Sequence, residues 1–395
     1  MPCVVRKQDL SRHAAGPLGI ALAALLMAMQ SAHGATLETI AREAFLMDAA
    51  TGAVLFEKNG DQPMPPASMS KMMTVHMLFE RLKEGSISLD DTFSVSERAW
   101  RDGGAKSGGS TMFLSPGERV RVEDLIRGIV IQSGNDASIV VAEGLASSEE
   151  TFAQAMTDRA HKLGLIHSTF RNATGLPDPE HMTTARDLAL LAIETIQEFP
   201  EYYRYYAEKQ FTYNGIRQGN RNPLLYRDTG VDGLKTGHTE ASGYGLTASA
   251  KRGDRRLVLV VNGLPSMKVR SHESERLLEW GFREFENYKL YAAGDTVADA
   301  DVWLGQERSV PLRIGKDLVV TLPRKARGEM KVAATFESPL PAPITKGDRL
   351  AKLVITAPGV DPIEVPLVAG TDVQRLGIFG RLGAALKYLL WGNTG

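Results

Sequence analysis

Residues 65–74 read PPASMSKMMT, in which two serines and one lysine lead directly into an apolar helical pattern. The pattern predicts a helix that starts in this stretch and ends near Gly85, a favourable residue just after a helix C-terminus. On a helix, Ser68 and Lys71 are three residues apart and share a face, whereas Ser70 and Lys71 diverge by about 100°. Ser68 is therefore the serine that we expect the Lys71 amine to contact.

This pairing suggests nucleophilic chemistry. A serine hydroxyl is a poor nucleophile until a base removes its proton, and a lysine can be that base only when burial or a nearby cation keeps it neutral. The free N–H groups and positive dipole end of a helix start can stabilise developing negative charge. In the alternative interpretation Ser68 caps the helix and Lys71 is solvated, because a single Ser-x-x-Lys spacing carries little information.

A second motif, SGN at 133–135, interrupts two helical patterns within residues 119–146. The interruption can place the side chains of Ser133 and Asn135 at the edge of a cleft. On its own, however, the triplet is more typical of a turn that caps a helix.

The third motif, KTG at 235–237, is interpreted as preceding a strand, with Gly237 allowing the backbone of a ligand to approach closely. Its alternative is the end of a surface strand. A further match, KSG at 106–108, lies in the run GGAKSGGS, which reads as a flexible loop and at most as the rim of a cleft.

Composition and targeting signals narrow the class of protein. The chain has 395 residues, a net charge of -1 and a pI of about 6.7, so it has no basic field to attract nucleic acid.

Basic residues, a short apolar run and the small-residue stretch SAHGA predict a secretory signal peptide over residues 1–34; an uncleaved anchor is the alternative. The single cysteine, Cys3, lies in this segment, so the exported chain would have no disulfide or thiolate metal ligand.

The order of apolar patterns predicts an α/β domain over residues 35–288. Residues 44–57 read as a hairpin, residues 244–263 as two strands joined by a KRGD turn, and helical patterns such as 148–164 and 183–197 lie between them. A last helix is expected in SHESERLLEWGFREFEN. We therefore expect an antiparallel sheet whose strands come from both ends of the domain, flanked by helices.

Two further segments follow this domain. Short β-rich runs punctuated by Pro and Gly predict a small all-β domain over residues 289–370. In residues 371–395, Ile378, Phe379 and Leu382 fall on an apolar arc opposite basic and aromatic residues. Such a helix is too short to span a membrane but suits the membrane interface, and the alternative is a helix docked on the protein.

Taken in order, Ser-x-x-Lys, Ser-x-Asn and Lys-Thr-Gly form the signature of penicillin-recognising serine enzymes. With the stretches SMSKMMT, MFLSPGE, IQSGNDAS, TTARDLALLA and VDGLKTGHT, the chain resembles the low-molecular-mass penicillin-binding proteins, which are serine-type D-alanyl-D-alanine carboxypeptidases. The resemblance covers nearly the whole chain after the signal segment. It implies a β-lactamase/transpeptidase-like domain, then a small all-β domain and a C-terminal amphipathic helix.

The resemblance also implies catalytic roles. Ser68 would attack the carbonyl between the last two D-alanines of a peptidoglycan stem peptide, with Lys71 as general base, kept neutral partly by the charge of Lys235. Ser133 would pass a proton to the leaving nitrogen. Asn135 would hydrogen-bond the substrate amide and steady Lys71.

Substrate-binding roles follow from the same resemblance. Lys235 and Thr236 would bind the terminal carboxylate, and the backbone N–H groups of Ser68 and His238 would form the oxyanion hole. Arg270, in MKVRSHES, matches the carboxylate-recognising arginine of the family, since an arginine fork meets a carboxylate bidentately. The alternative for Arg270 is a surface residue that caps the turn before the next helix.

Two other functions remain open at this point. A β-lactamase shares all three motifs, but no Glu-x-x-Leu-Asn stretch, which would activate water, occurs between residues 136 and 234. The second alternative function is a sensor or scaffold that penicillin acylates but that does not turn over.

Expected partners are peptidoglycan stem peptides, β-lactams as inhibitors and, through the C-terminal helix, the outer face of the cytoplasmic membrane in the periplasm. We expect no cofactor, no metal and no nucleic acid.

Overall fold

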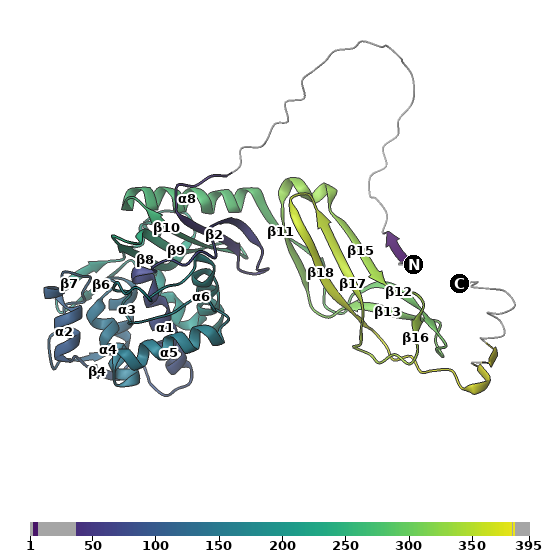
Figure 1. The fold of residues 1–395 in the computed structure, drawn as a ribbon, viewed down its shortest axis with the longest axis horizontal. Coiled ribbons are helices and arrows are strands. Elements are labelled where there is room, and N and C mark those ends of the chain that lie inside the picture. The colour runs from purple at the N-terminus through teal and green to yellow at the C-terminus, as the bar shows by residue number, and fades with distance from the viewer. Residues whose placement is uncertain (1–2, 7–36, 381, 384–395) are drawn as a thin grey trace, which may run out of the picture. The chain divides into compact units, whose positions relative to one another are not determined.

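The computed structural model describes residues 3–6, 37–380 and 382–383 (Figure 1). The chain divides into two compact units: the first unit is residues 38–283, and the second unit begins at residue 284. Most of the predicted signal peptide and of the predicted tail helix lies outside the described residues.

The first unit is built on an antiparallel five-stranded sheet in the order β3-β2-β10-β9-β8. Two strands come from the start of the unit and three from its end, so strands from both ends form the sheet as predicted, but β8 is a strand that the sequence analysis did not predict. The strand β8, which carries the KTG motif, lies at an edge of this sheet. The strand bounds are β2 Glu43–Asp48, β3 Val54–Lys58, β8 Val231–Thr239, β9 Gly243–Arg252 and β10 Arg255–Leu264.

Helices cover both faces of this sheet (Figure 1). On one face lies α8 (Met267–Glu284), whose Gly281 is so close that a Cβ atom there would touch side chains of β2 and β10. On the other face lie α1 (Lys71–Lys83) and α6 (Ala185–Glu198) with their neighbours. The remaining helices and short strands of the first unit are α2 Glu97–Gly103, α3 Val122–Val130, α4 Asn135–Ala146, α5 Glu149–Lys162, α7 Pro200–Tyr203, β4 Thr92–Ser94, β5 Arg119–Arg121, β6 Gln210–Tyr213 and β7 Ile216–Gly219.

The central helix α1, which begins at Lys71 of the first motif, packs in the core. It buries an apolar face that includes Met72, Val75, Leu78 and Phe79. Gly85, at φ +72°, follows its end in the left-handed conformation that glycine adopts without steric cost. The predicted C-terminal end of the helix is thus confirmed.

The second unit is an all-β domain. Its larger sheet has the order β1-β15-β17-β18-β13-β12-β16, and β11 pairs with β14 separately. Buried aliphatic side chains such as Leu312, Leu353 and Leu367 form its core. The bounds are β11 Phe285–Tyr291, β12 Thr296–Trp303, β13 Ser309–Ile314, β14 Leu318–Pro323, β15 Lys331–Phe336, β16 Leu340–Pro341, β17 Arg349–Ala357 and β18 Val360–Ala369.

Both ends of the chain contribute to this unit. The edge strand β1 (Cys3–Arg6) pairs with β15 and comes from the segment that the sequence predicts to be removed on export. After β18, Val373 bridges to Ile344, and the N–H of Leu376 donates to the carbonyl of Leu304 at 2.8 Å. The β-rich unit therefore continues as far as Leu376, beyond the predicted limit at residue 370.

The predicted fold class is confirmed: a transpeptidase-like α/β domain is followed by an all-β domain. The main local difference concerns the start of the first helix. The stretch Ala67–Ser70 is a 3-10 turn, labelled η1, and α1 begins only at Lys71.

Candidate active site

The turn η1 separates the two serines of PPASMSKMMT. Ser70 is fully buried, at 0% exposure, whereas Ser68 is partly exposed and lines a cavity. Ala67 adopts the left-handed region at φ +48°, which turns the chain sharply before Ser68. The structure therefore presents Ser68, not Ser70, to a ligand.

Two glycines on the sheet allow η1 to approach it. A Cβ atom at Gly237 would lie 2.9 Å from the carbonyl oxygen of Pro66, and one at Gly245 would lie 2.7 Å from the Cε atom of Met69. These glycines pair across β8 and β9. The KTG motif lies within a strand and not before one, so its predicted placement was wrong. Gly237 also makes room for the protein's own Ser68 turn, a role that the sequence did not suggest.

Lys71 is fully buried and directs its amine at three acceptors. Its Nζ atom lies 3.1 Å from Ser68 Oγ, 2.7 Å from Asn135 Oδ1 and 2.5 Å from the carbonyl oxygen of Thr174. A neutral amine has two N–H donors and one lone pair. It can donate to Asn135 and Thr174 while it accepts the hydroxyl proton of Ser68, which is the arrangement that a general base needs.

Burial lowers the pKa of Lys71 from 10.5 to about 7. The cation of Arg221 lowers this pKa further, while the carboxylates of Asp136 and Glu149 oppose the shift. Lys235 was expected to contribute this cation. Instead, burial first and then the charge of Lys71 lower the pKa of Lys235 well below 10.5, so Lys235 is itself driven toward the neutral form.

The SGN motif follows α3 and ends at Asn135, the first residue of α4, and Ser133 adopts the left-handed region at φ +67°. Lys235 Nζ donates to Ser133 Oγ at 2.9 Å, which links the second motif to the third. The buried carboxylate of Asp136 accepts from the backbone N–H groups of Met112 at 2.8 Å and Leu114 at 3.1 Å. These bonds hold the 110–114 segment against the motif.

We call residues 171–182 the Thr174 loop, because it supplies the carbonyl that Lys71 contacts. Asn172 organises the loop, since its Oδ1 atom accepts from the backbone N–H groups of Thr174, Gly175 and Leu176. The buried carboxylate of Glu149 accepts from the N–H of Ala173 at 3.0 Å. Both contacts hold the carbonyl of Thr174 in place next to the Lys71 amine.

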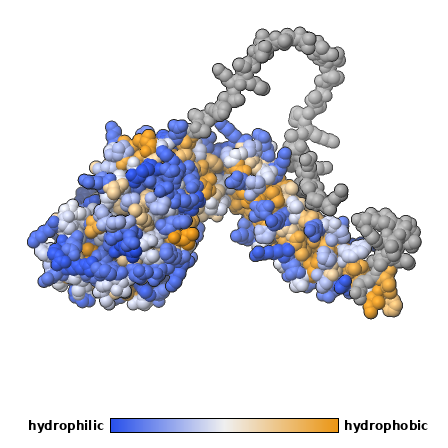
Figure 2. All heavy atoms as spheres, viewed as in Figure 1, coloured by the Kyte–Doolittle hydropathy of each residue, from blue (hydrophilic) through white to orange (hydrophobic). Residues whose placement is uncertain are grey.

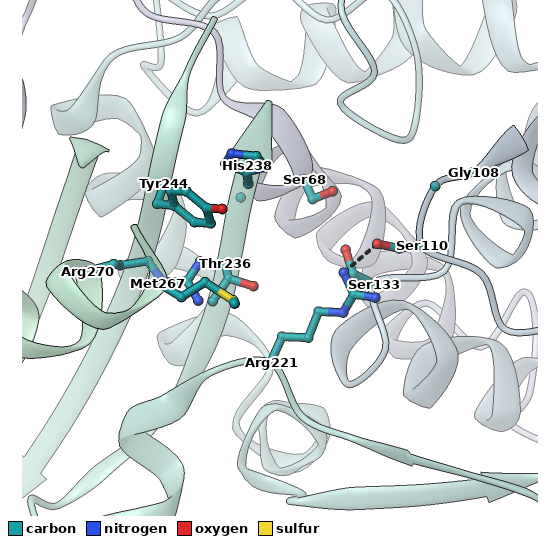
Figure 3. A pocket seen from close by; sticks show the side chains of 12 residues that line it. Ser68, Gly108, Ser110, Ser133, Arg221, Thr236, His238, Tyr244, Met267 and Arg270 are labelled. Atoms are coloured by element: carbon teal, nitrogen blue, oxygen red, sulfur yellow. Dashed lines mark hydrogen bonds between the residues drawn. The ribbon is translucent and has the colours of Figure 1, made fainter. Parts of the chain in front are cut away.

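These elements surround a cavity of about 510 Å³ (Figure 3). In Figure 3, Thr236 and His238 reach it from β8 and Arg270 from the helix α8, while Ser133 and Ser110 face them from the opposite wall. Gly108 of the KSG loop also lies on its rim. The lining residues are Ser68, Gly108, Gly109, Ser110, Ser133, Arg221, Thr236, Gly237, His238, Tyr244, Met267 and Arg270.

Arg270 is a buried cation at one end of this cavity. It is 5% exposed, and burial lowers its pKa to about 10. Its guanidinium lies 5.9 Å from the ring centroid of Tyr244, which in turn stacks on the His238 ring at 3.9 Å. Its Nε atom has no hydrogen-bond partner within the described part of the chain. The alternative of an exposed turn-capping arginine is therefore wrong, and a buried guanidinium, whose Nη1 donates to the carbonyl of Gly245 at 3.4 Å, lines the cavity.

Comparisons with known proteins agree with this geometry. Residues 28–266 match the family described as D-alanyl-D-alanine carboxypeptidase, and residues 285–375 match the family described as penicillin-binding protein 5, C-terminal domain. The chain belongs to the D-alanyl-D-alanine carboxypeptidase family.

Relatives in this family match along most of the chain. The D-alanyl-D-alanine carboxypeptidase DacC of Escherichia coli K12 is 43% identical over 89% of this chain and 89% of its own length. DacF of Bacillus subtilis is 35% identical over 85% of this chain and 87% of its own length. The crystal structure of penicillin binding protein 5 from Haemophilus influenzae is similar with a TM-score of 0.79 and 38% identity, covering 87% of this chain and 100% of that one.

Sequence reasoning missed several lining residues of this carboxypeptidase-family site. Arg221 and Ser110 belong to no motif and meet only through the fold, where Arg221 Nη1 donates to Ser110 Oγ at 2.6 Å. Tyr244 faces the site because it pairs with His238 across β8 and β9. The register of two strands, which the linear pattern does not specify, was the signal needed to find it.

No group of three His, Cys, Asp or Glu side chains that could hold a metal ion occurs in the described ranges. The polar groups of the site are hydroxyls, amines, an amide, guanidinium groups and the imidazole of His238. This donor set suits acyl transfer through a serine.

Proposed function

We propose that the protein removes the terminal D-alanine from peptidoglycan stem peptides through an acyl-enzyme on Ser68. One observation carries the proposal: Ser68 Oγ faces the cavity and lies 3.1 Å from the fully buried amine of Lys71, whose pKa is about 7. A serine beside an amine that is half neutral at physiological pH is an activated nucleophile.

Acylation uses the groups on both sides of Ser68. As its Oγ atom bonds to the carbonyl carbon, its proton moves to Lys71 Nζ. The backbone N–H groups of Ser68 and His238 stabilise the oxyanion. The bond to the leaving nitrogen then breaks as Ser133 Oγ, which Lys235 holds at 2.9 Å, passes its proton to this nitrogen and takes one from the Lys71 ammonium, so that Lys71 is neutral again. Water then attacks the ester carbonyl carbon and gives a proton to Lys71. As the bond to Ser68 Oγ breaks, Lys71 returns this proton to Oγ, which restores the Ser68 hydroxyl and the neutral amine.

The cationic end of the cavity gives specificity for a free terminal carboxylate. Arg270 and Thr236 both line the cavity, and the guanidinium lacks a protein partner at Nε. A carboxylate bound at this end would compensate the charge of the buried Arg270 guanidinium. The same end would accept the carboxylate of a β-lactam, in line with the name of the similar penicillin binding protein 5.

The test is D-alanine release from N-acetylated Lys-D-Ala-D-Ala by the wild type, Ser68→Ala and the exposed control Ser115→Ala. Intact mass after penicillin treatment comes from the same samples. We expect release and a lasting adduct in the wild type and in the control, with both lost in Ser68→Ala. A lasting adduct without release would indicate a sensor, and rapid loss of the adduct without release would indicate a β-lactamase.

We also infer a peripheral position on the periplasmic face of the membrane. Residues 1–34 would direct export, and the tail would bind the interface. Ile378, Phe379 and Leu382 are 67%, 90% and 64% exposed, and hydrophobic atoms lie open where the described chain ends (Figure 2). In the described ranges, no helix has the length and apolar character needed to cross a bilayer.

Because Val373 and Leu376 pair with the second unit, the truncation that tests the tail should remove residues 377–395. We expect this variant to move to the soluble periplasmic fraction with full carboxypeptidase activity. A truncated protein that stayed on the membrane would contradict the anchor.

A further inference from the structure

Ser70, the serine that faces away from the cavity, meets a histidine from a distant part of the chain. Ser70 Oγ lies 2.8 Å from His181 Nε2, and the two residues are 0% and 2% exposed. A serine beside a histidine resembles a nucleophile with its base. Neither residue lines the 510 Å³ cavity, so their contact needs another explanation.

The hydrogen-bond directions at this pair are determined by its neighbours. His181 Nδ1 accepts from the backbone N–H of Arg171 at 3.3 Å, so in the neutral ring Nε2 carries the proton and donates to Ser70. Ser70 Oγ in turn donates to the carbonyl oxygen of Ala67 at 2.9 Å. A relay thus runs from Arg171 through His181 and Ser70 to Ala67.

The end of this relay is the peptide group of the nucleophile. The carbonyl of Ala67 and the N–H of Ser68 belong to one planar peptide and point in opposite directions. A bond that fixes this carbonyl therefore fixes the direction of the Ser68 N–H. This N–H is one of the two groups assigned above to the oxyanion hole.

His181 is itself held firmly. Its neighbours Met182 and Thr183 form backbone bridges to Thr169 and Met64, and its ring packs edge-on against Phe170 with centroids 5.5 Å apart. Burial lowers the pKa of this histidine to about 4; the cations of Lys71 and Arg171 add to the effect and Asp178 opposes it. The ring is therefore neutral at physiological pH, as the relay requires.

The Thr174 loop also lies directly against the carbonyl of Ala67. A Cβ atom at Gly175 would lie 1.8 Å from the carbonyl oxygen of Ala67, so only glycine fits there. One loop thus contacts the general base through the carbonyl of Thr174 and the nucleophile's peptide through His181 and Gly175.

We propose that His181 is a positioning residue for the oxyanion hole, acting through Ser70 on the peptide that links Ala67 to Ser68. The proposal rests on the acyl-enzyme function given above. The relay orients the Ser68 N–H, and a hydrogen bond accepted by the carbonyl of the same peptide makes that N–H a stronger donor. The stronger N–H donor stabilises the transition state, in which negative charge develops on the substrate oxygen.

The experiment compares the full-length wild type with His181→Ala, His181→Gln, Ser70→Ala and the double variant His181→Ala/Ser70→Ala. His167→Gln, at an exposed histidine, is the matched control. Penicillin acylation is followed by stopped flow, which separates initial binding from the rate constant of acylation. Thermal midpoints are recorded for every protein, and Ser70→Ala, which removes a single oxygen atom, serves if His181→Ala does not fold.

We expect the acylation rate constant to fall about tenfold in His181→Ala and in Ser70→Ala, the size of one hydrogen bond, with initial binding unchanged. The double variant should be no slower than either single one, because both changes break the same relay. His181→Gln should recover most of the rate, since its amide can both donate to Ser70 and accept from Arg171.

A spectroscopic measurement separates positioning from general stability. In the penicilloyl-enzyme the ester carbonyl occupies the oxyanion hole, so its infrared stretching frequency reports the hydrogen bonds that it accepts. We expect a higher frequency in Ser70→Ala and His181→Ala than in the wild type. Unchanged frequencies, or independent multiplying effects in the double variant, would overturn the relay. A wild type that is not acylated at all would instead overturn the proposed function.

Discussion

The two units of the chain differ in whether they bury charged side chains. The first unit buries Lys71, Lys235 and Arg270 around one cavity. In the described part of the second unit, Thr321 is the buried polar side chain, and ion pairs such as Lys352–Glu364 lie at the surface. Burial of a cation is costly unless it is neutralised or paired. The difference indicates that the first unit carries the chemistry and the second is held together by its apolar core.

The largest effect is expected from a change at the buried amine. Lys71→Arg keeps a positive charge but places there a group that stays protonated, so it cannot accept the proton of Ser68. The rate of penicillin acylation should fall by about 10²- to 10⁴-fold, the usual contribution of a general base. Lys352→Arg in the second unit is the control and should leave the rate unchanged. A Lys71→Arg rate within a few-fold of wild type would remove the base from the mechanism.

The pH dependence should follow the same amine. Below its pKa of about 7 Lys71 is protonated and cannot act as a base. The acylation rate should therefore rise about tenfold per pH unit up to neutrality and level off above it. A flat profile between pH 5 and 7 would show that another group accepts the proton.

Folding stability should respond to pH through Lys71 as well. Its pKa is lower in the folded protein than the 10.5 of the unfolded chain, so between these values the unfolded state binds more protons and stability rises with pH. Urea unfolding at pH 7 and pH 9 measures this rise, which should be smaller in Lys71→Met.

A smaller effect on activity is expected at Arg270. Arg270→Lys keeps a charge but loses the fork that meets a carboxylate, so kcat/KM for the peptide should fall about 10- to 100-fold, mainly through KM. Arg276→Lys, on the same helix but paired with Glu273 at the surface, is the control. Equal kinetics in the two variants would place the carboxylate elsewhere in the cavity.

The smallest effect on activity is expected from the second unit. Leu353 is fully buried in its core, and Leu353→Ala should destabilise this unit by about 2–5 kcal/mol. Acylation of Ser68 should be unchanged, because Leu353 lies outside the first unit. Calorimetry and penicillin labelling on the same samples measure both quantities. Reduced labelling would mean that the second unit supports the active site.

Local patterns in the sequence predicted much of the framework. The strands around residues 44–57 and 244–263 alternate with helical patterns that carry their own caps and turns, so the α/β and all-β units could be recognised from periodicity. The pairing of Ser68 with Lys71 followed from a spacing of three residues. In each case the information lies within a few neighbouring positions, where helix and strand geometry link sequence distance to spatial distance.

The remaining features depend on contacts between distant segments. The lowered pKa of Lys71 needs the burial that several elements create together. The role of Gly237 became clear only when Pro66 was placed against it. Ser70 and His181 are 111 positions apart. The sequence by itself determined which chemical groups the site contains, while the tertiary structure decided which of them touch, are buried and lose their charge, because these properties arise only when separate elements pack around one cavity.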